Sequence, residues 1–215
     1  MAAIIFGMED LAALANFYLL NDSGTKPIAF CVDGKFIKEN TFEGLPVIPF
    51  EEIQTVYPST DHCFLAPLQD NNLRMIKSKE IKDKGYSLIS YVSTKSTVFS
   101  SVGENCFILE DNTIQPFVTI GNNIIMWSGN HIGHHSTIKD NVFFSSHVVL
   151  SGHCVVEQFC WLGVNSTIKD HITLSEGTFI AMSSMVTKNT TSYTKYMGVP
   201  AKEYGKIQPY SCCKT

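Results

Sequence analysis

The sequence predicts an α/β plus β fold in two parts: a small Rossmann-like domain with a parallel sheet, followed by a left-handed parallel β-helix. Three observations carry this prediction. The first ninety residues alternate short apolar runs with segments of helical periodicity. An apolar residue then recurs at every sixth position from residue 102 to residue 186. The chain of 215 residues is 44% apolar and 17% charged, which is typical of folded rather than disordered proteins.

The amino-terminal segment begins with a predicted strand and helix. Residues 2–6 form an apolar run, and residues 10–20 place apolar side chains at helical spacing. Three more apolar runs are expected as strands, at residues 26–34, 45–53 and 61–68. Alternating strands and helices indicate a small parallel sheet. The charged segment 74–88 is expected to be a solvated helix that leads to the second domain.

The ends of the first two strands supply a candidate ligand site. Ligands of open parallel sheets bind beyond the carboxyl ends of the strands, which places residues 7–10 and 33–35 at one crevice, from Gly7 to Asp10 and from Asp33 to Lys35. A dinucleotide fingerprint would need two more glycines after Gly7, so NAD binding is not predicted. Asp10 has a second interpretation, because a carboxylate at the start of a helix can cap the backbone amides.

An apolar ladder of period six predicts the second domain. Its fifteen members are Val102, Ile108, Ile114, Ile120, Met126, Ile132, Ile138, Phe144, Leu150, Val156, Leu162, Ile168, Leu174, Ile180 and Val186. Six is three times the period of a strand, so each repeat returns a side chain to the same face. Small or β-branched residues four places later are expected inside the corners, at Val118, Ser136, Val142, Val148, Cys154, Cys160, Ser166, Thr178 and Ser184. Three repeats make one coil, so the ladder describes about five stacked coils. A β-sandwich does not fit, because its turns recur at about 8–12 residues.

Composition excludes several classes of function. A net charge of −4 and a pI near 5.9 give no general attraction to nucleic acid or to anionic lipid. The sequence shows neither a signal peptide nor an apolar run that could span a membrane, so a cytoplasmic protein is expected. A disulfide framework is not expected. Most cysteines are predicted to be buried free thiols, among Cys31, Cys63, Cys106, Cys154, Cys160, Cys212 and Cys213.

Five of the seven histidines cluster in sequence, at His131, His134, His135, His147 and His153. Because Ile132 points inward in the ladder, its histidine neighbours are expected on the outer face or at a turn. A neutral imidazole can take a proton from an amine or hydroxyl that attacks a thioester. No HExxH or CxxC spacing is present, so no metal is predicted. An ordinary surface histidine remains the alternative for at least three of the five.

The ladder, together with Asn-His-Ile-Gly-His-His-Ser at 130–136 and Gly-Val-Pro-Ala-Lys at 198–202, resembles a known family. The chain resembles bacterial hexapeptide-repeat sugar acyltransferases of the sialic-acid O-acetyltransferase and bacillosamine N-acetyltransferase type. The resemblance covers nearly the whole chain. It implies a Rossmann-like sugar- or nucleotide-binding domain at 1–88, a β-helix acyltransferase domain at 89–200 and a C-terminal tail at 201–215. It also implies a homotrimer with acetyl-CoA between neighbouring β-helices.

The resemblance also implies the roles of individual residues. His134 falls where the family has its catalytic general base. His135 replaces the carboxylate that accompanies this base and is a candidate auxiliary group. Asp140 or a residue of a neighbouring subunit would otherwise take the place of the carboxylate, or the base is weaker. On the acetyl-CoA side the implied residues are Gly152 and Gly163, through backbone amides around them, and Lys202, near the phosphates. An ordinary exposed lysine is the alternative for the last of these.

The implied activity is acetyl-CoA-dependent acetylation of a sugar for surface glycan synthesis. The amino group of a nucleotide-linked amino-deoxysugar is the favoured acceptor, and a sugar hydroxyl is the alternative. Asp33 matches an acidic residue that contacts the nucleotide in the family, whereas Glu9 stands where the family has a glycine-rich turn. Two other classes stay open: a non-catalytic trimeric scaffold, and a nucleotide-sugar binding protein whose β-helix only trimerises.

Overall fold

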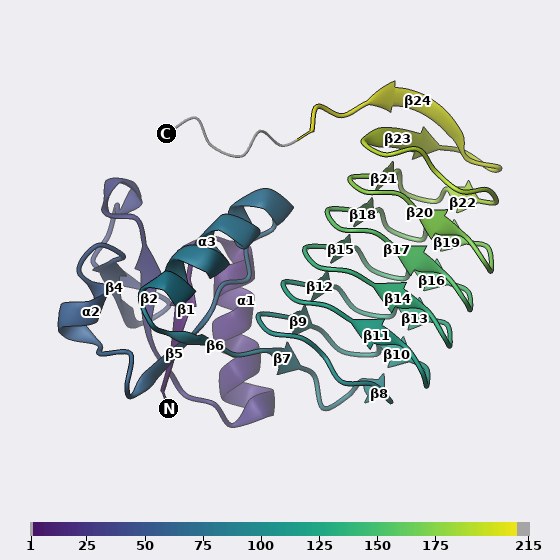
Figure 1. The fold of residues 1–215 in the computed structure, drawn as a ribbon. Helices are drawn as coiled ribbons and strands as arrows, with labels where there is room; N and C mark the ends of the chain where they lie inside the picture. The colour runs from purple at the N-terminus through teal and green to yellow at the C-terminus, as the bar shows by residue number, and fades with distance from the viewer. Residues whose placement is uncertain (1, 210–215) are drawn as a thin grey trace.

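The computed structural model describes residues 2–209 and places a mainly parallel sheet beside a tall stack of short strands (Figure 1). The sheet has the order β3-β4-β2-β1-β5-β6, and its neighbouring strands are parallel except for β3 and β4. Its strands are β1 (Ala2–Phe6), β2 (Pro27–Val32), β3 (Thr41–Phe42), β4 (Leu45–Pro49), β5 (His62–Leu65) and β6 (Ser87–Leu88). The four predicted apolar runs therefore form the four longer strands of the sheet.

Apolar side chains cover both faces of this sheet. Along β1, Ala3 and Ile5 pack into one cluster of buried residues, while Ile4 and Phe6 pack into another. A strand buried on both faces reads as the continuous apolar run seen in the sequence. The helical segments are α1 (Asp10–Tyr18), a π-helical turn η1 (Leu19–Ser23), a 3-10 turn η2 (Gly34–Phe36), α2 (Ile53–Val56) and α3 (Asn71–Asp83).

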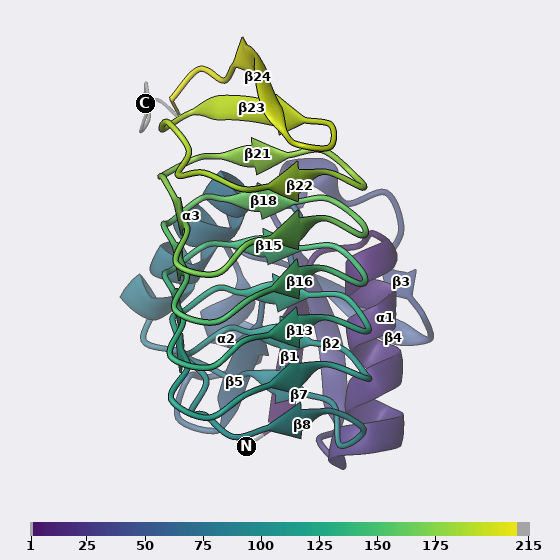
Figure 2. The same ribbon diagram turned by 90° about the vertical axis from the view of Figure 1, so that its right-hand side faces the viewer.

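The second part is a parallel β-helix whose coils stack in three sheets (Figure 2). The first sheet holds β8 (Thr97–Val98), β10 (Thr113–Ile114), β13 (His131–Ile132), β16 (Val149–Leu150), β19 (Thr167–Ile168) and β22 (Met185–Val186). The second holds β11 (Thr119–Ile120), β14 (Thr137–Ile138), β17 (Val155–Val156) and β20 (Thr173–Leu174). The third holds β7 (Tyr91–Val92), β9 (Phe107–Ile108), β12 (Ile125–Met126), β15 (Phe143–Phe144), β18 (Trp161–Leu162) and β21 (Phe179–Ile180). Partners in the ladders, such as Thr113 and His131, lie eighteen residues apart, so one coil is three hexads.

The interior of the β-helix confirms the period of six. Fourteen ladder positions are buried, and Val102, at the first coil, is half-buried. The nine small or β-branched residues expected inside the corners are all buried, with exposures of 6% or less. The residue directly before the inward residue of a corner turns that corner. It often has a positive φ, as at Asn105, Asn123 and Asn141. Asparagine and histidine are enriched in this conformation, and Asn105, Asn123 and Asn141 join their side chains into a vertical ladder of hydrogen bonds.

The third sheet of the β-helix packs against the first domain. Its outward side chains Tyr91, Phe107, Ile125 and Phe143 share a buried cluster with residues of β1 and α1. This sheet is therefore apolar on both sides, and the first and second sheets form the part of the β-helix that faces away from the first domain (Figure 1).

The expectation that the charged helix is solvated was wrong. Arg74 of α3 is fully buried, and its guanidinium donates to the backbone carbonyls of Asn123 at 2.9 Å and Val142 at 3.4 Å. Lys77 and Ser78 of the same helix are also buried. The backbone carbonyls at the β-helix corners need donors, and long basic side chains supply them while their stems pack on apolar surface. The helix α3 therefore links the two domains.

The end of the chain also differs from a simple tail. Strands β23 (Thr194–Met197) and β24 (Lys202–Lys206) form an antiparallel pair above the last coil, so residues expected at the start of the tail form a strand. Five cysteines, at 31, 63, 106, 154 and 160, are buried and free, whereas Cys212 and Cys213 lie outside the described residues. Within residues 2–209, every helix is too short or too polar to cross a bilayer.

Candidate active site

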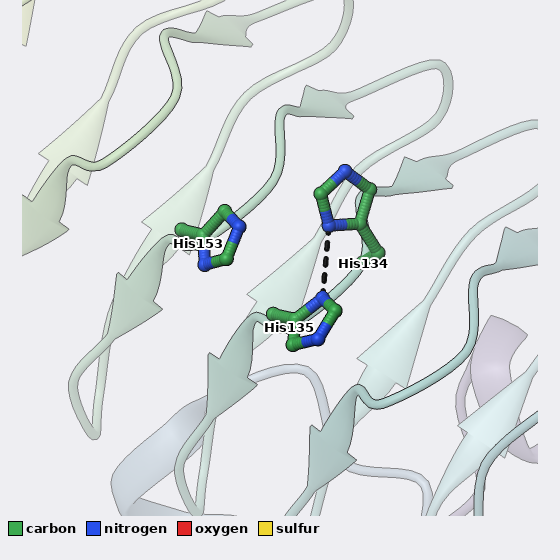
Figure 3. Close-up of side chains that lie close together, drawn as sticks. All are labelled: His134, His135 and His153. Carbon is green, nitrogen blue, oxygen red and sulfur yellow. Dashed lines mark hydrogen bonds between the residues drawn. The ribbon is translucent and has the colours of Figure 1, made fainter.

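His134 and His135 project from the corner between β13 and β14 (Figure 3). The ladder places Ile132 inside, so the residues that follow emerge at the corner, and both histidines are exposed. Backbone bonds hold this corner: the amide of Gly133 donates to Leu150 at 2.7 Å, and the amide of His153 donates to the carbonyl of His134 at 2.9 Å. The two imidazoles therefore stand on a rigid part of the fold.

The two rings are joined through their Nδ1 atoms, which lie 3.0 Å apart. A hydrogen bond between two imidazole nitrogens needs a proton on one of them and a lone pair on the other. When His134 is the donor, its own Nε2 carries the free lone pair and can act as a base. In that arrangement Nδ1 of His135 accepts the proton of His134 Nδ1 and orients its ring.

A column of aromatic rings continues from this corner along the β-helix. His135 stacks on His153 with ring centroids 4.9 Å apart, and His153 stacks on His171 at 4.7 Å. Phe117 packs against His135 on the opposite side, also at 4.7 Å. These four residues turn equivalent corners of successive coils with positive φ, and each lies eighteen residues after the one before it. Partial desolvation of the stacked ring and the neighbouring imidazoles lower the pKa of His153, which favours its neutral form.

The other two histidines of the predicted cluster, His131 and His147, are not part of this column of rings. His131 belongs to β13 and is half-buried. His147 turns a different corner with positive φ, and its ring packs against Gly129, where an added Cβ would lie 2.5 Å from Nδ1. The interpretation of these two as ordinary corner or surface histidines fits the structure.

Gly152 gives the His134 ring its space. A Cβ atom at this position would lie 2.9 Å from Cε1 and 3.0 Å from Nε2 of His134. At Gly163 a Cβ would meet the backbone of Met182 at 2.6 Å, and the Gly163 amide already donates to the carbonyl of Ile180. Lys202 is exposed on β24. The two glycines thus keep the coils close, and Gly152 lies beside the candidate base.

Asp140 does not pair with His134 within the chain. It lies at the next corner of the coil, where Oδ1 accepts a hydrogen bond from the Asn122 amide at 2.8 Å. There it lines a hollow of ≈ 300 Å³ with Gly121 and Gln158. The suggestion that Asp140 replaces the missing carboxylate is therefore not supported by the arrangement within one chain.

A second candidate site is a cavity of ≈ 520 Å³ beyond the carboxyl ends of β1 and β2. It is lined by the three predicted residues Gly7, Asp10 and Asp33, and by Glu9. Glu9, not Asp10, is the N-cap residue of α1, and its side chain makes no capping hydrogen bond. The structure thus brings together the residues predicted for this crevice.

Three lysines also line this cavity, and only Lys35 was expected there from the sequence. Lys77 reaches in from α3, with its Nζ 2.7 Å from both Asp33 and Glu80. Burial opposes its charge, but the hydrogen bonds that its ammonium donates to the two carboxylates outweigh burial and raise the pKa of Lys77. Lys35 and Lys38 line the same cavity from the segment after β2. Lys77 was not predicted because its helix was expected to be solvated, and the sequence gave no signal for Lys38.

The fold has known relatives among solved structures. A perosamine N-acetyltransferase variant from Caulobacter crescentus, in complex with CoA and GDP-perosamine, matches 96% of this chain and 98% of its own, with a TM-score of 0.88 and 20% identity. The acetyltransferase domain of PglB from Neisseria gonorrhoeae, in complex with acetyl coenzyme A, matches 94% and 98%, with a TM-score of 0.86 and 15% identity. The chain has the fold of these acetyltransferases. WeeI from Acinetobacter baumannii matches 95% and 100%, with a TM-score of 0.83 and 18% identity. The sequence matches no protein-family model and no curated protein.

Proposed function

We propose that this protein transfers an acetyl group from acetyl-CoA to the amino group of a nucleotide-linked amino sugar, with His134 as the general base. The observation that carries the proposal is the exposed pair of His134 and His135, joined through Nδ1 so that Nε2 of His134 can be basic. Supporting it, relatives with the same fold over nearly the whole chain bind CoA, and one binds GDP-perosamine. A sugar hydroxyl is the alternative acceptor.

The reaction needs one base and no covalent enzyme intermediate. Nε2 of His134 takes a proton from the acceptor amine as the amine nitrogen attacks the thioester carbonyl. A C–N bond forms, and the resulting tetrahedral intermediate is stabilised by a backbone amide. The C–S bond then breaks, and the proton on His134 passes to the departing sulfur, so CoA leaves as the thiol. The chain around Gly152 and Gly163 and the Lys202 ammonium are the proposed contacts with the pantetheine and the phosphates.

The cavity of the first domain is the proposed site for the nucleotide. We assign this domain to the Rossmann-like class and the β-helix to the left-handed class. Lys35 and Lys38 are the proposed source of positive charge for a diphosphate, and Asp33, whose other partner is Lys77, is the proposed polar contact with the nucleoside. Glu9 lines the same cavity and opposes a phosphate beside it, so the diphosphate is expected nearer to the lysines.

The two sites imply that the active unit contains more than one chain. The third sheet of the β-helix packs on the first domain, whereas His134 projects from the corner between the first two sheets. A sugar held in the crevice of one chain is therefore separated from His134 of that chain by the thickness of the β-helix. We infer a homotrimer in which the crevice of one chain faces the histidine corner of its neighbour. Acetyl-CoA is the donor, and we place the reaction in the cytoplasm, where this donor is made.

The proposal is tested by measuring thiol release from acetyl-CoA against a panel of nucleotide-linked amino sugars and free glycans. Release that depends on an acceptor is expected, and His134→Ala should lower kcat/KM by about 10²-fold or more. His147→Asn is the matched control, because that histidine turns another corner. If no acceptor supports thiol release and acetyl-CoA does not bind, the protein is a non-catalytic trimeric scaffold. If a nucleotide sugar binds without turnover, the protein is a nucleotide-sugar binding protein whose β-helix only trimerises.

A further inference from the structure

His134, His135 and His153 form a compact group of potential metal ligands (Figure 3). One ring nitrogen from each lies within 4.8 Å of one from each of the other two, and all three side chains are exposed. Nitrogens bound to one zinc ion at about 2.0–2.1 Å lie roughly 3.3 Å apart in a tetrahedron. The Nδ1 atoms of His134 and His135 are already 3.0 Å apart, and the ring of His153 has to turn out of its stack on His135 to bring a nitrogen to the same ion.

The fold holds these rings together independently of any ligand. His135 and His153 turn equivalent corners of successive coils, with φ of 58° at both, and their rings stack with an interplanar angle of 15°. The ring of His134 stands edge-on to both of the others, with centroids 5.2 Å from each. The ring of His134 packs directly against Gly152, where a Cβ would lie 2.9 Å from its Cε1. Three exposed imidazoles in one group suit a divalent transition metal whose remaining ligand is water.

We propose that His134, His135 and His153 form a binding site for a divalent transition-metal ion of the zinc class, and that the bound ion inhibits acetyl transfer. A neutral imidazole has one basic nitrogen. When that lone pair binds a metal, it is not available to take a proton from the acceptor, whichever ring nitrogen is used. The inhibition rests on the proposed function of His134, whereas the binding of the metal does not.

Metal binding is tested on the full chain after treatment with a chelator. Co²⁺ is titrated first, because its visible absorption reports tetrahedral nitrogen coordination, and Zn²⁺ is then used to displace it. One ion per chain is expected. Loss of a ligand costs at least as much as loss of an outer-shell partner, so His153→Asn should weaken binding by about 10–100-fold or more. Asparagine is chosen because it tolerates the positive φ at this corner.

Two histidines provide matched controls. His147→Asn makes the same change at another corner, and His171→Asn removes the ring that stacks on the far side of His153. Both variants should bind Co²⁺ as the wild type does. Equal binding by the wild type and His153→Asn, or binding of Co²⁺ without a defined stoichiometry, would overturn the proposal.

Inhibition is tested separately with the acetyl-transfer assay. Zn²⁺ should stop the wild-type enzyme and should have at least about tenfold less effect on His153→Asn, which retains His134 and His135. If no acceptor supports transfer but Co²⁺ binds with the expected stoichiometry, the proposed function fails and the metal site stands. If transfer is observed but the chelated enzyme binds no Co²⁺, the metal site is refuted and the function stands.

Discussion

Nδ1 of His134 lies 3.0 Å from Nδ1 of His135, so the hydrogen-bond partner of the proposed base is an imidazole and not a carboxylate. A neutral acceptor orients the ring of His134 but stabilises its protonated form less than an anion does. This difference between the two kinds of partner can be measured.

Replacing His135 by aspartate should shift the pH dependence of catalysis. A carboxylate next to His134 favours the imidazolium, and the base is active only when neutral, so activity appears at higher pH. We expect the acid limb of the kcat/KM profile to move up by about one pH unit in His135→Asp. His135→Asn, which keeps a neutral acceptor and tolerates the positive φ, should leave the limb in place. The same profile in both variants would show that His135 does not contact the base during catalysis.

Gly152→Ala should lower catalysis without unfolding the protein. The new methyl group would lie 2.9 Å from Cε1 of His134, and the exposed ring can rotate away from it. Misplacement of a catalytic group by about 1 Å can cost about 10²-fold in rate. We expect a fall in kcat of this order with an unchanged Tm. Gly205→Ala is the control, since a Cβ there makes only an ordinary contact at 3.8 Å. Full activity of Gly152→Ala would contradict the position assigned to His134.

Arg74→Met should destabilise the protein strongly. The guanidinium of Arg74 satisfies backbone carbonyls of both domains, including those of Leu68 and Asn123, and the side chain is fully buried. Methionine fills part of the volume but leaves buried carbonyls without these donors, at a cost of about 3 kcal/mol in the free energy of unfolding. Urea denaturation measures this loss. Lys79→Met on the exposed side of the same helix should change stability by less than about 0.5 kcal/mol.

Asp22 should make the stability of the protein sensitive to acid. Hydrogen bonds from the hydroxyl of Thr94, the hydroxyl of Tyr91 and the amide of Thr94 hold the pKa of Asp22 well below its usual value. A carboxyl group with a lowered folded-state pKa stabilises the protein above its unfolded pKa of about 3.9 and loses this contribution as the pH falls further. Asp22→Asn should therefore lower Tm at pH 7 and flatten the decline of Tm below about pH 4.

The control for this measurement is Asp111→Asn, which removes the same charge at an exposed corner. Asparagine suits the positive φ of that corner, so its Tm should follow the wild type at each pH. Parallel curves for Asp22→Asn and the wild type would show that the contacts of Asp22 do not contribute to stability.

Periodic features of the fold could be predicted from the sequence because they depend on one-dimensional spacing. An inward side chain recurs whenever the backbone returns to the same face, so the ladder from Val102 to Val186 was sufficient to predict the β-helix. The apolar runs of the first domain likewise mark strands buried on both faces. The helix α3 could not be assigned correctly, because Arg74 and Lys77 read as solvated charges until the surfaces that bury them are known.

In the candidate site, too, some features follow from the sequence and others from tertiary contacts. The sequence by itself determined the β-helix, the crevice residues Gly7 and Asp33, and an exposed position for His134. Only the tertiary structure decided which histidines meet, because His153 reaches His135 through the eighteen-residue pitch of a coil and both rings emerge where the corner requires positive φ. It also decided that Asp140 lies at another corner and that Lys77 enters the crevice. Side-chain spacing along a strand is local, whereas contacts between coils and domains depend on how whole surfaces are buried together.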